Sequence, residues 1–70
     1  MNDYIRSNVL ALRKRTGITQ EDLALAVGVT RQTVIAIEKG NYCPSLLLGF
    51  RISRYFKMNV EKAFTYKYDK

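Results

Sequence analysis

Apolar residues recur along this chain at the spacing that predicts amphipathic helices. Near the N-terminus, Ile5, Val9 and Leu12 stand at i, i+4 and i+7, positions that share one face of a helix. Similar apolar stripes follow in four further segments: Leu23, Ala24 and Val27; Val34 and Ile37; Leu48, Ile52 and Phe56; Val60, Ala63 and Phe64. The pattern predicts five short helices, so the expected fold class is all-α.

Residues that end and begin helices lie between these stripes. Glycines follow the first three stripes and candidate N-caps precede the last four: Gly17, Gly28 and Gly40, then Thr19, Thr30, Ser45 and Asn59. Asp22, three residues after Thr19, occupies the capping-box position, where Glu or Gln is more usual. The boundaries of the helices are therefore marked independently of their apolar stripes.

The five stripes place the core within residues 5–64, and we expect residues 1–70 to form one domain with a tail at 65–70. A chain of 70 residues buries only about 60% of its unfolded surface, which leaves little room for a deep pocket. In the tail, Thr65, Tyr66, Lys67 and Tyr68 alternate polar and aromatic side chains. This alternation fits either a frayed end or a short strand, and such a strand could pair with its twin in a second copy.

Composition limits the chemistry open to the chain. Twelve Lys and Arg against six Asp and Glu give a formal net charge of +6, which favours a polyanionic partner such as nucleic acid or anionic lipid. Histidine is absent and Cys43 is the single cysteine, so an intramolecular disulfide, a histidine zinc site and a histidine base are excluded. The sequence shows no nucleophile–base pair or Gly-rich phosphate loop, so we expect no enzyme activity, cofactor, metal or small-molecule ligand.

The sequence also bears on the cellular compartment. No apolar run approaches the roughly 20 residues of a membrane span, and the start MNDYIRSNVL lacks the apolar stretch of a signal peptide. The basic residues are dispersed over several short helices, which disfavours a basic helix that lies on an anionic membrane. We therefore expect a cytoplasmic protein with no membrane partner.

The second and third predicted helices are joined by only about three residues, Gly28–Thr30. So short a connection makes the helices cross sharply and leaves the first turn of the third helix exposed. The segment GITQEDLALAVGVTRQTVIAIEKG resembles the helix-turn-helix regulators of the phage repressor and Cro type. The continuation PSLLLGFRISRYFKMNVEKAF resembles the last two helices of small bacterial and archaeal members, so the resemblance covers residues 5–64. It implies a five-helix repressor-like domain that binds double-stranded DNA.

The resemblance implies roles for particular side chains. Arg31 and Gln32, at the start of the third helix, are expected to contact base edges, together with Ala36 one turn later. Contacts to the DNA backbone are expected from Arg13, Thr19, Gln20, Thr30, Thr33, Lys39 and Asn41. Which bases are contacted stays open, Arg31 suits a phosphate equally well, and a merely solvated helix face is the alternative.

Glu38 has a different implied role. It lies at the end of the third predicted helix, where the helix dipole disfavours an acid unless a cation is near. In the resembling family an arginine of the first helix fills that need, which implies a partly buried ion pair between Arg13 and Glu38.

The sequence departs from the family pattern at several positions. Ile35 occupies an exposed position where a small polar residue is usual, and Gly49 stands in the fourth helix where alanine is typical. Leu47, Phe50 and Tyr55 lie off the core stripe of that helix and are expected to form an exposed apolar patch.

These features together predict a sequence-specific repressor that binds an inverted-repeat operator as a homodimer. The expected dimer interface consists of aromatic and apolar residues from the C-terminal third: Phe50, Tyr55, Val60, Phe64, Tyr66 and Tyr68. In the alternative, Val60 and Phe64 complete the monomer core while the tail frays. A second class of function also stays open, namely a protein-interaction module such as an antitoxin or anti-repressor on the same fold.

Overall fold

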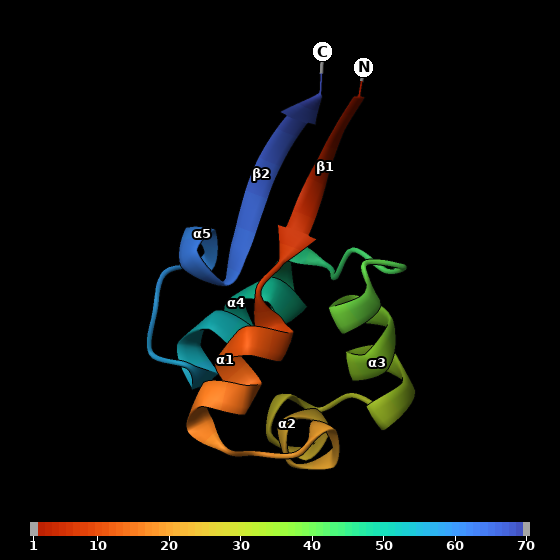
Figure 1. Ribbon diagram of the computed structural model, residues 1–70. Coiled ribbons are helices and arrows are strands. Elements are labelled where there is room, and N and C mark those ends of the chain that lie inside the picture. Colours follow the sequence, from red (N-terminus) through yellow and green to blue (C-terminus); the bar gives the residue numbers. More distant parts are fainter. Residues whose placement is uncertain (1, 70) are drawn as a thin grey trace.

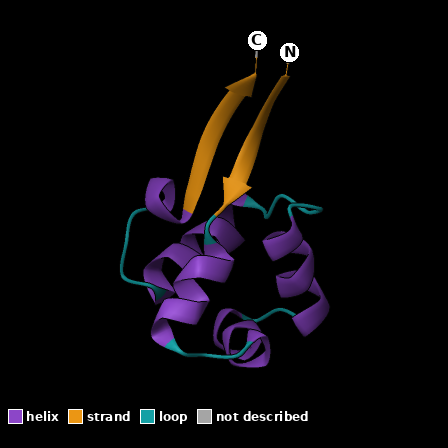
Figure 2. Cartoon of the chain, viewed as in Figure 1, coloured by secondary structure: helices purple, strands orange, loops and turns teal. Residues whose placement is uncertain are grey.

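The computed structural model describes residues 2–69, and within this range it contains five helices and two strands (Figure 1). The elements in chain order are β1 (Asn2–Ser7), α1 (Val9–Thr16), α2 (Gln20–Val27), α3 (Arg31–Lys39), α4 (Leu46–Tyr55), α5 (Val60–Ala63) and β2 (Phe64–Asp69). The five predicted helices are present and the domain is mostly helical, but all-α is not exact because residues 2–7 and 64–69 form two strands (Figure 2).

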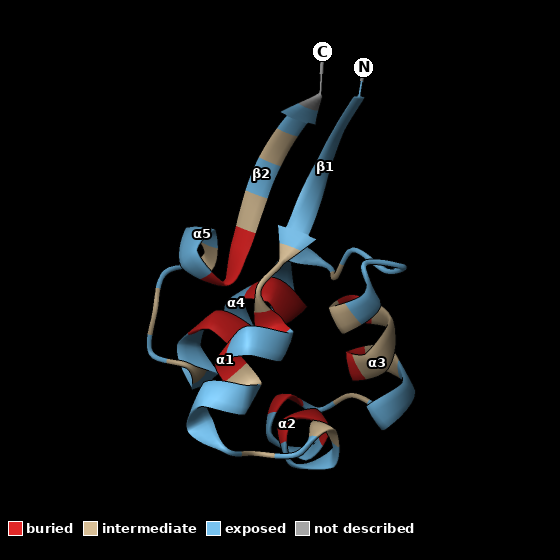
Figure 3. Ribbon diagram, viewed as in Figure 1, coloured by how far each residue is buried: buried red, intermediate tan, exposed pale blue. Residues whose placement is uncertain are grey.

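The hydrophobic core is built from the apolar stripes that the sequence predicts. All five helices contribute to it, together with the first residue of β2 (Figure 3). The buried members are Val9, Leu12, Leu23, Ala24, Val27, Val34, Ile37, Leu48, Ile52, Ala63 and Phe64. Phe56 and Val60 are partly buried against this cluster, whereas Ile5 is 41% exposed and lies outside it.

The predicted helix caps are largely confirmed. Thr19 and Asp22 form a reciprocal capping box, in which each backbone N–H donates to the other residue's side chain at 3.0 Å. The hydroxyls of Thr30 and Ser45 accept a backbone N–H three residues further on. Asn59 lies at the predicted cap position of α5, but its side chain makes no capping hydrogen bond.

Two helix boundaries differ from the prediction. The first helix begins at Val9 rather than near Ile5, because the backbone N–H of Asn8 donates to the carbonyl of Ala63 at 2.9 Å and ties the chain to the end of α5. Residues before Asn8 then run as β1. At the other end, Phe64 does not continue the fifth helix but opens β2, with φ −135° and ψ 129°. The i, i+4 spacing of Ile5 and Val9 therefore spans a strand and a helix.

The two strands form an antiparallel ribbon. Asn2 pairs with Asp69, Ile5 with Tyr66, and Ser7 with Phe64 at the foot of the ribbon. The tail is therefore a strand rather than a frayed end, and its partner is β1 of the same chain rather than a second copy. The molecule measures 37 × 23 × 21 Å, and the ribbon projects from the helices with the two chain ends side by side at its tip (Figure 1).

Within the described range, no helix combines the length and apolar character needed to cross a bilayer.

Candidate nucleic-acid interface

The turn between α2 and α3 has the tight geometry that the sequence predicts. Gly28 ends α2 in the left-handed region with φ 77°, and the backbone N–H of Val29 donates to the carbonyl of Ala24 at 3.0 Å. Such a conformation favours glycine because other residues are strained there. The two helices pack against each other, and α3 lies along one side of the molecule with its first turn directed away from the ribbon (Figure 1).

The first turn of α3 exposes two of the three side chains expected to contact bases. Arg31 and Gln32 are exposed, and neither side chain hydrogen-bonds to another part of residues 2–69. Thr30 differs, because its hydroxyl accepts the N–H of Thr33 at 3.2 Å and lies 3.1 Å from the Thr33 hydroxyl. Ala36 follows on α3 and is half-buried. The free polar groups of this turn are thus those of Arg31 and Gln32.

A shallow hollow brings together residues expected to contact DNA from three parts of the chain. It has a volume of about 500 Å³ and lies where the end of α1, the start of α2 and the start of α3 meet. Its lining residues are Arg13, Ile18, Thr19, Gln20, Glu21 and Arg31. Arg31 and Glu21 are exposed here and Arg13 is paired with Glu38, so the hollow offers guanidinium N–H donors to a phosphate without a net excess of positive charge.

The predicted ion pair between Arg13 and Glu38 is present. Arg13 Nε donates to Glu38 Oε2 at 2.7 Å and Nη2 donates to Oε1 at 3.3 Å, so the pair is bidentate. The side chains are 13% and 5% exposed, respectively, which makes this a largely buried pair. Arg13 Nη1 also donates to the carbonyl of Ile18 at 3.1 Å. Three of the five guanidinium N–H donors are therefore engaged inside the protein, and two stay free for a ligand.

Gln20 makes a bond inside the protein that the sequence did not predict. Gln20 Nε2 donates to Glu38 Oε1 at 3.0 Å, which engages one of its two amide N–H donors and leaves the other for the expected phosphate contact. Glu38 therefore joins α1 through Arg13, α2 through Gln20, and α3, on which it lies. We call these three residues the Glu38 cluster. The sequence indicated the arginine but gave no sign of the glutamine bond, because Gln20 lies 18 positions away from Glu38.

The Glu38 cluster holds its carboxylate ionised. Burial disfavours the charged form of Glu38, but hydrogen bonds from Arg13 and Gln20 and the charges of Arg13 and Lys14 outweigh it, so the pKa of Glu38 is lowered. The same pair raises the pKa of Arg13, chiefly through the hydrogen bond to Glu38. The backbone and side-chain hydrogen bonds with Thr19 lower the pKa of Asp22. The acids that fix these helices are thus charged at neutral pH.

The interface continues beyond the end of α3. Gly40 ends this helix with φ 80°, and the backbone N–H of Asn41 donates to the carbonyl of Ala36 at 2.9 Å. Lys39 and Asn41, both expected to contact the DNA backbone, are exposed. The C-terminal end of α3 and the residue after its cap therefore expose a lysine side chain and an asparagine amide.

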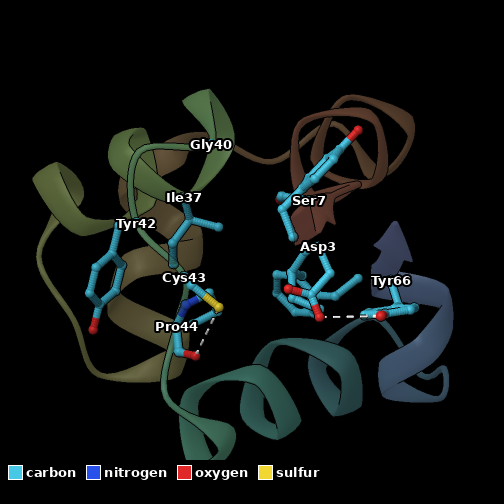
Figure 4. Close-up of a pocket in the computed structure, with 11 residues that line it drawn as sticks. Asp3, Ser7, Ile37, Gly40, Tyr42, Cys43, Pro44 and Tyr66 are labelled. Carbon is cyan, nitrogen blue, oxygen red and sulfur yellow. Dashed lines mark hydrogen bonds between the residues drawn. The ribbon is translucent and has the colours of Figure 1, made fainter. Parts of the chain in front are cut away.

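A hollow of about 400 Å³ separates the loop after α3 from the ribbon (Figure 4). Tyr42 lies on one side, and Asp3 and Tyr66 lie on the other, where the Tyr66 hydroxyl donates to Asp3 Oδ2 at 3.2 Å. Cys43 lies between them as an exposed free thiol. The sequence did not indicate this hollow, because it depends on where the ribbon lies.

The structure divides the residues expected at the dimer interface into two surfaces. Phe50 and Tyr55 line an open groove between α2 and α4, whereas Val60, Phe64 and Tyr66 line a hollow at the foot of the ribbon. Tyr68 lies further out on β2 and is exposed. Phe64 is buried in the core of the chain itself, as the alternative proposed. The six residues therefore line two separate hollows and the outer part of β2.

Comparison with known proteins finds similarity to helix-turn-helix proteins. A profile of the helix-turn-helix family matches residues 9–62. The HTH-type transcriptional regulator YgzD of Bacillus subtilis is 53% identical over 60 residues, which cover 86% of this chain and 91% of that protein. An HTH-type transcriptional regulator of Methanocaldococcus jannaschii is 56% identical over 52 residues, covering 74% and 79%.

A solved structure is similar as well. The restriction-modification controller protein C.AhdI of Aeromonas hydrophila superposes with a TM-score of 0.74 at 27% identity, covering 80% of this chain and 85% of that one. The range matched by the family profile, residues 9–62, includes the two crossed helices α2 and α3. The chain therefore belongs to the Cro/C1-type helix-turn-helix family.

Proposed function

We propose that this protein is a sequence-specific double-stranded DNA-binding transcriptional repressor that acts as a homodimer on an inverted-repeat operator. The observation that carries the proposal is the first turn of α3, where Arg31 and Gln32 are exposed and make no side-chain hydrogen bond to the described residues. A helix with such an end fits the major groove, where arginine pairs with guanine and glutamine with adenine. The similarity to transcriptional regulators and to a restriction-modification controller protein supports the same role.

In this proposal the Glu38 cluster fixes the angle at which α3 enters the groove. Its hydrogen bonds hold the start of α2 and the end of α1 against α3. The remaining guanidinium donors of Arg13, the N-terminal turn of α2, Lys39 and Asn41 then contact phosphates on either side of the groove. Phosphate contacts position the protein, and Arg31 and Gln32 supply the discrimination between bases, with Ala36 against a thymine methyl group.

The dimer is proposed to form through α5 and β2. One recognition helix spans only a few base pairs, so two helices about 34 Å apart are needed to specify a site. The surface around Val60, Tyr66 and Tyr68 lies at the ribbon, away from the exposed start of α3, and is rich in exposed aromatic side chains. Aromatic residues are enriched at interface cores. Phe64 supports this surface from within the core rather than contacting the partner.

Selection of bound duplexes from a random DNA pool tests the proposal. We expect enrichment of an inverted repeat whose half-sites are one helical turn apart, about 10 base pairs. Light scattering of the protein with the selected duplex should give two chains per duplex. A pool that stays random after repeated rounds would contradict sequence-specific binding, and a single half-site would contradict the dimer.

A second candidate function, protein binding, is favoured by the groove between α2 and α4. Leu25 is 78% exposed at this groove, next to Phe50 and Tyr55. Exposed apolar side chains gathered at one groove are typical of a protein-binding surface. In this candidate the chain would act as an antitoxin-like or anti-repressor-like module. Substitution of Leu25 by Ser separates the two functions, because it removes groove contacts and leaves the α3 face intact.

A further inference from the structure

The ribbon has two chemically different faces. Because side chains alternate along a strand and paired residues share a face, Tyr4 and its partner Lys67 lie on the same face as Arg6 and its partner Thr65. We call these four residues the basic face of the ribbon. The opposite face carries Ile5 and Tyr66, with the acid Asp3 hydrogen-bonded to the Tyr66 hydroxyl.

The β1 edge of the ribbon, which carries Arg6, adjoins the end of α3. β1 packs against α3, and a groove of about 370 Å³ is lined by residues 4–7 of β1, from both faces of the ribbon, together with Glu38, Lys39 and Gly40. Arg6 is exposed and makes no ion pair within residues 2–69. The cation Lys39, already proposed to contact DNA, thus lies across this groove from the uncompensated cation Arg6.

The basic face continues outward beyond Arg6. Lys67 pairs with Tyr4, two residues further along the ribbon, which is about 6.6 Å at the usual rise of a strand. The pair of Asn2 and Asp69 follows at the tip of the ribbon. Lys39, Arg6 and Lys67 therefore follow one another from α3 out along the ribbon, with the acid Asp69 at the next register position of the same face. The other neighbouring acid, Glu38, is already neutralised by Arg13.

We propose that the basic face of the ribbon binds the phosphate backbone of DNA and extends the interface beyond the helix-turn-helix unit. The inference rests on the proposed function, since it adds phosphates to a duplex already bound by α3. Arg6 supplies a planar guanidinium able to hold a phosphate through two N–H donors, and Tyr4 supplies a hydroxyl beside it. Because these contacts are to phosphate, they strengthen binding to all sequences and leave the choice of base to Arg31 and Gln32.

The test is the salt dependence of binding by the full chain to its selected duplex, followed by fluorescence anisotropy between 50 and 300 mM KCl (roughly the range over which phosphate contacts dominate). Arg6→Gln and Lys67→Gln should each lower the steepness of log affinity against log salt by about 0.9 per bound chain. Arg6→Lys should restore most of the slope, because it restores the charge. Lys57→Gln removes an exposed lysine between α4 and α5, outside the ribbon and outside the proposed DNA and dimer surfaces, and should leave the slope unchanged.

The outcomes separate this inference from the proposed function. If the unsubstituted protein binds no duplex, or binds with no dependence on salt, the proposed function itself is wrong. If it binds steeply and Arg6→Gln and Lys67→Gln keep its full slope, the ribbon does not contact DNA and the inference is overturned. If Lys57→Gln reduces the slope as much as Arg6→Gln, the effect reflects net charge alone and the inference is equally overturned. Unchanged amide hydrogen exchange in β1 and β2 of each variant shows that the ribbon is intact.

Discussion

The contacts that stabilise the helix-turn-helix unit join residues close together in the sequence, whereas those that stabilise the ribbon join residues far apart. In α2 and α3, each cap joins residues three positions apart, and Leu23, Ala24, Val27, Val34 and Ile37 are all buried within two consecutive helices. In the ribbon, every pair joins the two ends of the chain, from Asn2 with Asp69 to Ser7 with Phe64. The caps and apolar stripes of α2 and α3 are therefore encoded within a few neighbouring residues, whereas the pairing of the two strands is not.

The ribbon is also much less buried than the helix-turn-helix unit. Tyr4, Ile5, Tyr66 and Tyr68 of the ribbon are all between 41% and 61% exposed, whereas the apolar residues of α2 and α3 named above are at most 4% exposed. An isolated two-stranded ribbon is marginally stable in water. The ribbon must therefore depend on its foot, where Phe64 is buried and Asn8 bonds to α5 and β2. The two regions should respond independently to substitution, and the following experiments examine that independence.

Replacement of Glu38 by Ala should have the largest effect, on the helix-turn-helix unit. It leaves Arg13 largely buried without its partner, and the loss of such a partner costs about 3 kcal/mol of unfolding free energy. The double variant with Arg13→Ala should lose less than the sum of the two single losses. Urea unfolding of all three variants measures the coupling, with Glu21→Ala as an exposed control. Additive losses would mean that the pair contributes nothing to holding α1 against α3.

Arg31→Ala should weaken binding to the selected duplex by about 2 kcal/mol, within the range expected for one bidentate base contact. Its unfolding free energy should stay unchanged, because the side chain is exposed and bonds to no described residue. Anisotropy titrations against the preferred duplex and a scrambled duplex measure the effect. An equal loss on both duplexes would assign Arg31 to a phosphate instead of a base.

The same difference in contact range separates what could be predicted from the sequence from what could not. The caps Thr19, Thr30 and Ser45 and the apolar stripes were predictable because each depends on neighbours within one helical turn. The Arg13–Glu38 pair was predictable only through the family resemblance. The bond from Gln20 to Glu38 and the pairing of β1 with β2 were not predictable, since each depends on how distant segments pack.

Ile5 illustrates the limit most clearly. Its spacing from Val9 and Leu12 satisfies helical periodicity, and the alternation of Tyr4, Ile5 and Arg6 satisfies strand periodicity equally well. What decides between them is the hydrogen bond of the Asn8 backbone to Ala63, at the other end of the sequence. The tail likewise becomes a strand because β1 is available beside it.

Acid should lower the unfolding free energy of the helix-turn-helix unit, by less than the substitution of Glu38 by Ala does. The pKa of Glu38 is lowered below its ordinary value of 4.5 and that of Asp22 below 3.8, so both bind protons less readily when folded than when unfolded. Their contributions are therefore complete above those ordinary values and are lost as the pH falls through the folded pKa. Thermal unfolding between about pH 7 and pH 3 should show this loss, and Glu38→Gln should flatten it. An equally steep loss in Glu38→Gln would place the acid sensitivity elsewhere.

Asn8→Ala should loosen the ribbon and leave the helix-turn-helix unit in place. Its side-chain amide donates to the Lys62 carbonyl at 3.0 Å and to the Thr65 hydroxyl at 3.1 Å, and both bonds hold β2 against the start of α1. Loss of these partly exposed bonds should cost about 1 kcal/mol. Amide hydrogen exchange should quicken in β1 and β2 but stay slow in α2 and α3. Uniformly faster exchange would show that the two regions unfold as one.

Gly49→Ala should have the smallest effect, and its sign tests how tightly the foot of the ribbon packs on α4. Glycine inside a helix costs about 0.5–1 kcal/mol relative to alanine. A Cβ at this position would lie 3.7 Å from Val60 Cγ2 and 3.9 Å from Phe64 Cε2, which is ordinary van der Waals contact. The methyl group therefore fits without displacing the ribbon, and urea unfolding should show a gain of about that size. Gly40→Ala is the matched control, because its φ of 80° strains any side chain and should turn the gain into a loss. If Gly49→Ala also lowered the unfolding free energy, α5 and β2 would pack more closely on α4 than these distances indicate. The ribbon would then depend on the helices more than its exposure suggests.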